Sequence, residues 1–98
     1  MNDIEYICDR LSEGELLAQL AEEATELAHA ALKLRRTLSN DNPTPVNHDD
    51  ATDNLKEEIA DILLMLDVLG IDPLALEIDM TKAKKLERWA RRLECAND

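Results

Sequence analysis

The sequence predicts an all-α fold, a bundle of three main helices preceded by a short N-terminal helix. Three observations support it. The 98 residues include only 2 Gly and 3 Pro. Apolar residues recur at steps of three and four, as on one face of a helix. No segment alternates apolar and polar residues, as a half-buried strand does. The length suits one domain, and we expect a single helical domain over residues 1–98.

The first two helices are indicated by their apolar spacing and by a cap. Ile4, Ile7 and Cys8 predict a short helix over residues 3–10. Ser12 and Glu15 then have the spacing of a capping box, which predicts that a long helix starts there and runs to about residue 38. The apolar positions of this helix are Leu16, Leu20, Ala24, Leu27, Ala31, Leu34 and Leu38.

Breaker residues divide the rest of the chain. Residues 39–50 contain two prolines and predict a loop, which is either a substrate-discriminating lid or an ordinary connector. We expect the next helix to begin between Asp50 and Asn54 and to end at Gly70. Asp72 and Pro73 then predict a cap and first turn for the last helix, which frays near Glu94. The apolar positions of these two helices are Leu55, Ile59, Ile62, Leu66, Leu69, Leu74, Ile78, Leu86, Trp89 and Leu93.

The composition excludes some partners. With 22 acidic and 11 basic residues, the net charge is -11, which opposes binding to nucleic acid polymers or anionic membranes. There is no leader and no apolar run of transmembrane length, so we expect a cytoplasmic protein. Two isolated cysteines predict free thiols. Because aromatic residues make up only 2%, the core is built from small side chains, and we expect a homo-oligomer.

Two acidic clusters stand out because like charges on neighbouring turns repel. The first is Glu22, Glu23 and Glu26, and the second is Glu57, Glu58 and Asp61. At about 100° per residue, the middle acid of each cluster lies about 60° from the apolar stripe of its helix, the last about 120°, and the first about 160°. The two helices therefore repeat the same arrangement.

If these helices pack antiparallel, two pairs of carboxylates face each other. Oxygen ligands without a nearby thiol or imidazole suit a hard cation, Mg²⁺ or Mn²⁺. Residues 62–66 are apolar on all sides, so we expect burial there, and an ionised Asp61 at the edge of this run needs a partner. Asp67, in the same region, has a structural or interfacial role. The alternative is that both clusters are solvated helix faces.

With these motifs, the chain resembles the MazG-like, all-α nucleoside triphosphate pyrophosphohydrolases. Their signature E-E-x-x-E followed by E-x-x-D is matched at residues 22–26 and 58–61. The resemblance extends over about residues 16–92. It implies a MazG-like helical domain assembled as a homodimer or homotetramer, with the site in a bundle that can include a partner chain.

The resemblance also implies a reaction and roles for the acids. The reaction is hydrolysis of a nucleoside triphosphate, usually a deoxynucleotide, to the monophosphate and pyrophosphate, in the service of nucleotide-pool cleansing. The implied Mg²⁺ ligands are Glu23, Glu26, Glu58 and Asp61. Glu22 and Glu57 are the implied supporting acids, which either hold the ligands or activate the attacking water. The sequence offers no Ser/His/Asp or Cys/His set, so metal-activated water is the favoured nucleophile.

Many of these enzymes also carry a downstream helix whose Asn and evenly spaced Lys or Arg hold phosphate. Here Lys82, Lys85 and Arg88 follow one another at steps of three, although the Asn has no clear counterpart. This row either contacts the triphosphate or is a solvated basic face favoured by the helix dipole. Lys56, beside the second acidic cluster, is a weaker candidate.

Three other residues have an ordinary interpretation. Trp89 is expected in the core or an interface rather than stacked on a nucleobase. His29, opposite the apolar stripe, and His48, in the loop, are expected at the surface.

Two other functions stay open: another nucleotide pyrophosphohydrolase of the same superfamily, such as one acting on phosphoribosyl-ATP, and a non-catalytic acidic helical module that binds a protein partner.

Overall fold

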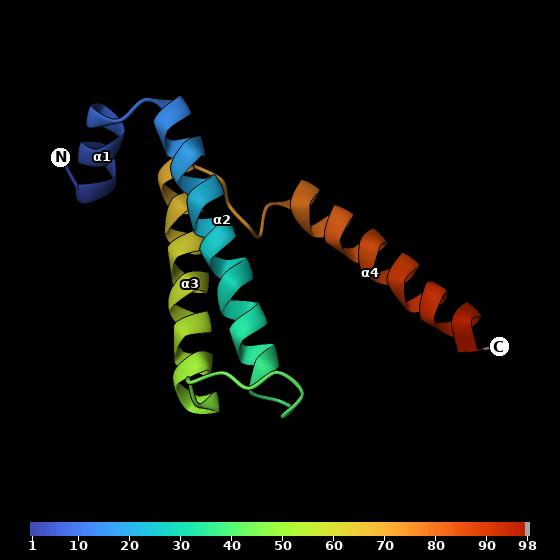
Figure 1. The fold of residues 1–98 in the computed structure, drawn as a ribbon. Coiled ribbons are helices and arrows are strands. Elements are labelled where there is room, and N and C mark those ends of the chain that lie inside the picture. Colours follow the sequence, from blue (N-terminus) through green and yellow to red (C-terminus); the bar gives the residue numbers. More distant parts are fainter. Residues whose placement is uncertain (98) are drawn as a thin grey trace.

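The computed structural model describes residues 1–97, which form four helices and no strand (Figure 1). The helices are α1 (Asp3–Arg10), α2 (Glu13–Arg36), α3 (His48–Leu69) and α4 (Leu76–Asn97). The all-α prediction is therefore confirmed for this range. Within it, none of the helices combines the length and the apolar character that a membrane crossing requires.

Helices α2 and α3 form an antiparallel pair that holds the core. The buried residues are Leu16, Ala30, Ala51, Met65 and Val68. Ala30 and Ala51 are each 1% exposed, and alanine at both positions lets the two backbones approach closely. Helix α1 closes one end of the pair, where Ile7 packs on the core and the thiol of Cys8 donates to the Val68 carbonyl oxygen at 3.3 Å.

Helix α2 starts where the sequence predicted, and helix α3 starts earlier than predicted. Ser12 caps α2, because its hydroxyl oxygen accepts from the amide of Glu15 at 3.2 Å. Helix α3 was expected between residues 50 and 54 but begins at His48, since Asn47 accepts from the amide of Asp50 at 2.8 Å. Asn is as good a cap as Asp. His48 is thus the first residue of α3 rather than part of the loop, which covers residues 37–47.

The connection to α4 also differs from the expectation. Gly70 ends α3 as predicted, in the left-handed conformation with φ 75° that glycine adopts without strain. Asp72 does not cap α4. Its carboxylate accepts from the amide of Leu74 at 2.9 Å and its carbonyl accepts from Ala75, which closes a turn over Pro73. The helix begins only at Leu76, and it continues past Glu94 to Asn97.

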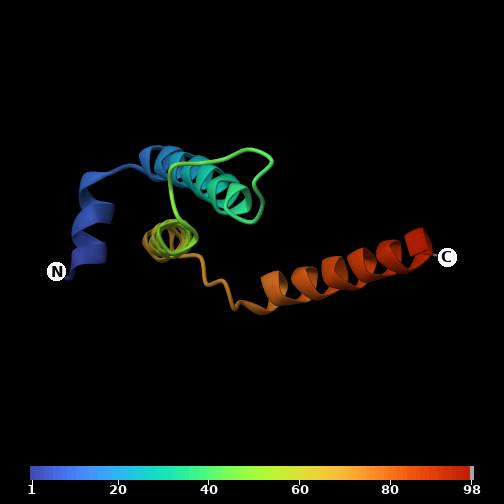
Figure 2. The same cartoon turned by 60° about the horizontal axis from the view of Figure 1, so that its bottom comes forward.

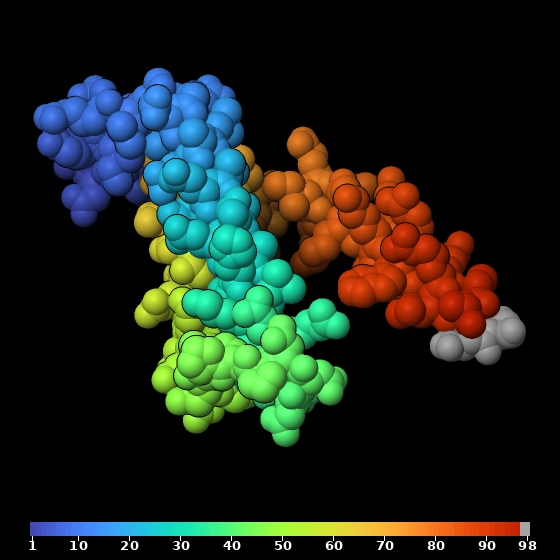
Figure 3. All heavy atoms as spheres, in the orientation of Figure 1, coloured from blue at the N-terminus to red at the C-terminus, as the bar shows by residue number. Residues whose placement is uncertain are grey.

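Helix α4 does not join a three-helix bundle within one chain, which corrects the predicted architecture. It leaves the pair on the side away from α1 and extends outward (Figures 1 and 2). In the space-filling view it stands clear of α2 over most of its length (Figure 3). Every side chain of residues 76–96 is exposed, so the expected core position of Trp89, which is 58% exposed, is not realised in a single chain.

The buried stripes are rotated from the predicted ones toward the acids. In α2 the buried and half-buried positions are Leu16, Leu20, Glu23, Leu27, Ala30, Leu34 and Thr37. Ala24, Ala31 and Leu38, assigned to the stripe, are exposed, as is Ile59 in α3. The run over residues 62–66 was expected to be buried on several sides, but Leu63 and Leu64 are about half exposed. Both helices are apolar over a wider arc than one partner helix covers.

Candidate metal centre

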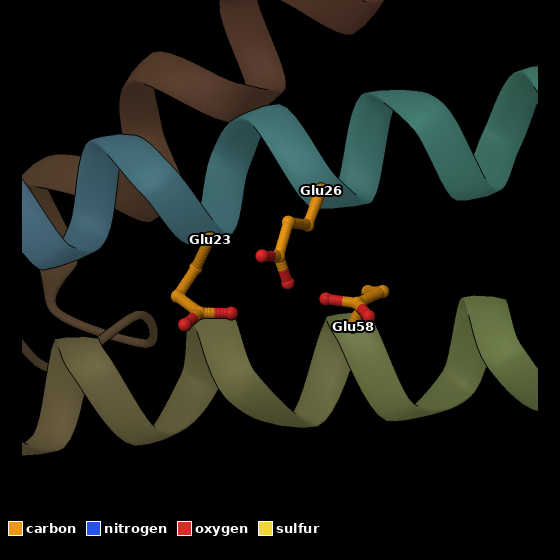
Figure 4. Close-up of side chains that lie close together, drawn as sticks. All are labelled: Glu23, Glu26 and Glu58. Carbon is orange, nitrogen blue, oxygen red and sulfur yellow. The ribbon is translucent and has the colours of Figure 1, made fainter.

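Three glutamates converge between the paired helices. Glu23 and Glu26 project from α2 and Glu58 from α3 into the space between them (Figure 4). One carboxylate oxygen from each lies within 4.8 Å of those of the other two. Glu23 and Glu26 are one turn apart on the same face of α2, and α3 presents Glu58 opposite them because the helices are antiparallel.

Two of these carboxylates contain buried oxygens without a hydrogen-bond partner, namely Oε2 of Glu23 and Oε2 of Glu58. The other oxygen of Glu23 accepts from the Gln19 side chain at 2.8 Å. Desolvation, and then the charges of Glu26, Asp61 and Glu23, raise the pKa of Glu58 above its ordinary value. The group is therefore a concentration of negative charge with unused oxygen ligands.

These donors fit a hard divalent cation. Mg²⁺ binds carboxylate oxygens at about 2.1 Å, so two ligands on opposite sides of one ion are about 4.2 Å apart. The three oxygens lie within 4.8 Å of one another, which is close to that spacing. No thiol or imidazole belongs to the group, which disfavours softer metals. A cation here would supply partners for the two orphaned oxygens and cancel the repulsion.

A family model for the MazG nucleotide pyrophosphohydrolase domain matches residues 11–87. The chain belongs to this family. The matched MazG segment contains α2, the loop, α3 and the first half of α4, and with them both acidic clusters. No curated protein and no solved structure matches the chain.

The other acids of the MazG motifs lie outside the triad. Asp61 follows Glu58 by one turn on α3 and is half-buried, and its charge contributes to the raised pKa of Glu58. Its oxygens are not part of the group within 4.8 Å. Glu22 and Glu57 are exposed.

The basic row of α4 is not at the acids in a single chain. Lys82, Lys85 and Arg88 are all exposed on α4, which extends away from the pair (Figure 2). Lys56 is exposed on α3 and points away from Glu58, because two residues along a helix turn by about 200°.

Three residues beside the triad were not singled out from the sequence. A shallow pocket of about 210 Å³ is lined by Glu26, His29, Ala30, Lys33, Asn54 and Glu58. Lys33 follows Glu26 by seven residues and Asn54 precedes Glu58 by four, so both share a helix face with an acid. Gln19 precedes Glu23 by four and donates to it. Inspecting the positions four or seven residues from each acid, which lie on the same helix face, would have found Gln19, Lys33 and Asn54.

Proposed function

We propose that this protein is a Mg²⁺-dependent nucleoside triphosphate pyrophosphohydrolase that releases pyrophosphate and a nucleoside monophosphate, in the service of nucleotide-pool cleansing. One observation carries the proposal. Three carboxylates meet between two helices with two buried oxygens unpartnered, in a chain of the MazG family. A purely structural acidic cluster would leave this repulsion uncompensated.

We assign Glu23, Glu26, Glu58 and Asp61 to the metal. Asp61 would reach the ion by a side-chain rotation, since it lies one turn along the same helix from Glu58. Bound there, Mg²⁺ or Mn²⁺ would screen the triphosphate, polarise the attacked phosphorus and make bound water more acidic. These carboxylates, carried by two packed helices, would hold the ion in a defined place.

Glu22 and Glu57 are assigned to the attacking water. Each is next to a metal ligand in sequence and is exposed, so its carboxylate is free to accept a hydrogen bond from water at the open side of the site.

The triphosphate tail is assigned to Lys82, Lys85 and Arg88. Their charges suit phosphate oxygens, and the arginine can bind them with two parallel hydrogen bonds. Because α4 extends away from the acids of its own chain, this role requires the assembled protein, which we propose is a homodimer or homotetramer (Figure 1).

Pyrophosphate release tests the assignment. A panel of ribo- and deoxynucleoside triphosphates is assayed with Mg²⁺, with Mn²⁺ and with chelator, and phosphoribosyl-ATP is included. Chelator is expected to abolish release, and Glu58→Gln to lower it at least about 100-fold, because a neutral amide is a poor ligand for Mg²⁺. Glu13→Gln is the matched control, an exposed glutamate in the first turn of α2.

The panel also decides between the candidate functions. Metal-dependent release from one nucleotide class names the substrate. If folded, metal-loaded protein releases nothing from any nucleotide, the acids form a binding surface, and the non-catalytic interaction module becomes the better description.

A further inference from the structure

The pocket beside the triad opens toward the end of the helical pair where residues 37–47 connect α2 to α3. The residues that line it are Glu26, His29, Ala30, Lys33, Asn54 and Glu58. The pocket therefore shares two carboxylates with the triad and adds an imidazole, an ammonium group and an amide. Ala30, which is 1% exposed, is the one apolar residue in this lining. A ligand in the pocket is thus held by charge and hydrogen bonds.

This lining suits a phosphate group better than a nucleobase. Proteins hold bases by stacking them on aromatic side chains, and the lining contains no Phe, Tyr or Trp. Phosphate oxygens are bound by cationic side chains and by amide donors. Lys33 and Asn54 supply one of each kind. The chemistry of the pocket therefore matches the phosphate part of a nucleotide.

Helical geometry directs the Lys33 side chain toward the acids. Lys33 follows Glu26 by seven residues, so it lies on the same face of α2, about 10 Å further along the axis. Side chains on a helix lean toward its N-terminus, and from Lys33 that direction is toward Glu26. Asn54, four residues before Glu58, lines the same pocket from α3 and is half-buried. The two nitrogen donors therefore come from opposite helices.

The Lys33 ammonium group is not paired with the acids of the pocket. In the part of the chain that the structure describes, ion pairs join His48 to Asp49 and Arg91 to Glu87, and Lys33 takes part in neither. Lys33 thus lines a pocket with two carboxylates without contacting either of them as an ion pair. This separation leaves room for an anionic ligand between the ammonium group and a metal ion on the acids.

The charge of the site requires a cationic group besides the metal. Three ionised carboxylates outweigh one divalent cation, and a triphosphate brings more negative charge to the same place. Fixed cations near the phosphates offset this repulsion. The basic row of α4 extends away from the acids of its own chain (Figure 2). Lys33, in contrast, is held beside them by α2, in the same pocket as Glu26 and Glu58.

We propose that Lys33 and Asn54 bind a phosphate group of the substrate, in the pocket beside the triad and from the same chain as the acids. The Lys33 ammonium group donates to a phosphate oxygen from α2, and the Asn54 amide donates from α3. Both residues bind and orient the substrate, and neither takes part in breaking a bond. This role rests on the proposed function and adds two substrate-contacting residues to it.

A structural role for Lys33 is separated from this one by a neighbouring residue. Lys33, Arg35 and Arg36 all lie in the last turn of α2, where positive charge interacts favourably with the helix dipole. Arg35 shares that position but does not line the pocket, because two residues along a helix turn by about 200°. Arg35→Gln is therefore the matched control for Lys33→Gln.

Binding of the products tests the contacts without turnover. Pyrophosphate and deoxynucleoside monophosphates are titrated separately, by calorimetry, into protein saturated with Mg²⁺. Lys33→Gln is expected to weaken binding of one of them at least about tenfold, because a hydrogen bond to a charged group is lost. Asn54→Ala is expected to weaken the same product at least about threefold. Lys33→Arg should retain most of the affinity, and Arg35→Gln should change neither. The product that loses affinity identifies the phosphate that Lys33 contacts.

Mn²⁺ binding, measured without phosphate, separates this contact from damage to the triad. Lys33→Gln should not weaken it, and a weaker Mn²⁺ affinity would overturn the proposed contact. If the wild type releases pyrophosphate while Lys33→Gln binds both products as tightly as Arg35→Gln does, the phosphate contact is wrong and the proposed function stands. A metal-loaded wild type that binds neither product and releases no pyrophosphate from any nucleotide overturns both.

Discussion

At the scale of single residues, Glu58 is where stability and the proposed function conflict. Its pKa is raised by desolvation and by three neighbouring acids. In the metal-free protein the folded state therefore binds the Glu58 proton more tightly than the unfolded state does. The corresponding contribution to stability is present below the ordinary carboxyl pKa and is lost as the pH rises through the raised one. At neutral pH the metal-free triad works against folding.

Glu58→Gln is accordingly expected to raise thermal stability without metal and to reduce the stabilisation that metal provides. Without metal, the melting temperature should rise, because the substitution removes a charge from a repelling cluster. With Mg²⁺ or Mn²⁺, the wild type should gain stability by ligand binding and the variant should gain much less. Thermal unfolding with and without each metal checks both.

Glu13→Gln, outside the cluster, should show neither effect. Equal metal stabilisation of the wild type and Glu58→Gln would remove Glu58 from the metal ligands.

The acids themselves were foreseeable, because the helical period places Glu23, Glu26 and Glu58 near one edge of their helices. The burial of the Glu23 and Glu58 side chains was not predicted. The predicted stripes included exposed apolar positions such as Ala24, Ala31 and Ile59 together with the buried ones, so Glu23 and Glu58 were placed too far from the core. Sequence periodicity cannot divide an apolar arc between a partner helix and a second surface.

At the scale of helices, the sequence predicted all four helices correctly, but it misplaced the first residues of α3 and α4. Ser12 and Gly70 were unambiguous signals, since each stands alone at its boundary. The start of α3 lies in a segment with several possible caps, and Asn47 is used in place of the later Asp and Thr residues. The residues Asp72 and Pro73 are compatible both with the cap and first turn of a helix and with a separate turn before the helix, so the local sequence does not decide where α4 starts.

The cap of α3 can be tested against the predicted one. Asn47→Ala should lower the free energy of unfolding by about 1 kcal/mol, because the hydrogen bond to the amide of Asp50 is lost. Asp53→Ala, inside the range where the sequence predicted the start, should change it by less than about 0.5 kcal/mol. Urea denaturation measures both, and a reversed order would place the helix start at residue 53.

At the scale of the whole molecule, the chain contains two charged regions that do not meet. The acids lie between α2 and α3, and the basic row lies on a helix that extends away (Figure 1). The sequence predicted both regions but not their separation, because the direction of α4 depends on a turn of a few residues and not on helical periodicity.

Mixing two inactive variants would show whether the two regions meet between copies. One is Glu58→Gln, and the other carries Lys82→Ala, Lys85→Ala and Arg88→Ala. If the row serves the partner's acids, mixed dimers formed by unfolding and refolding the variants together should recover about a quarter of the wild-type rate, because half the dimers are mixed and each holds one complete site. Pyrophosphate release is the readout.

Each variant refolded alone is the control. Mixed dimers that form but stay inactive would mean that the row and the acids do not combine across the interface.

Gly70 has a stereochemical consequence. An L-alanine there would meet no neighbour within 4 Å, so crowding contributes nothing to its cost. The cost, about 1–2 kcal/mol, arises because the left-handed conformation is wrong for an L-residue. The same backbone conformation is the ordinary one for a D-amino acid. In a chemically synthesised chain, D-alanine at this position would keep the end of α3 and stabilise it by restricting the unfolded chain. The junction from which α4 departs is thus set by handedness rather than by packing.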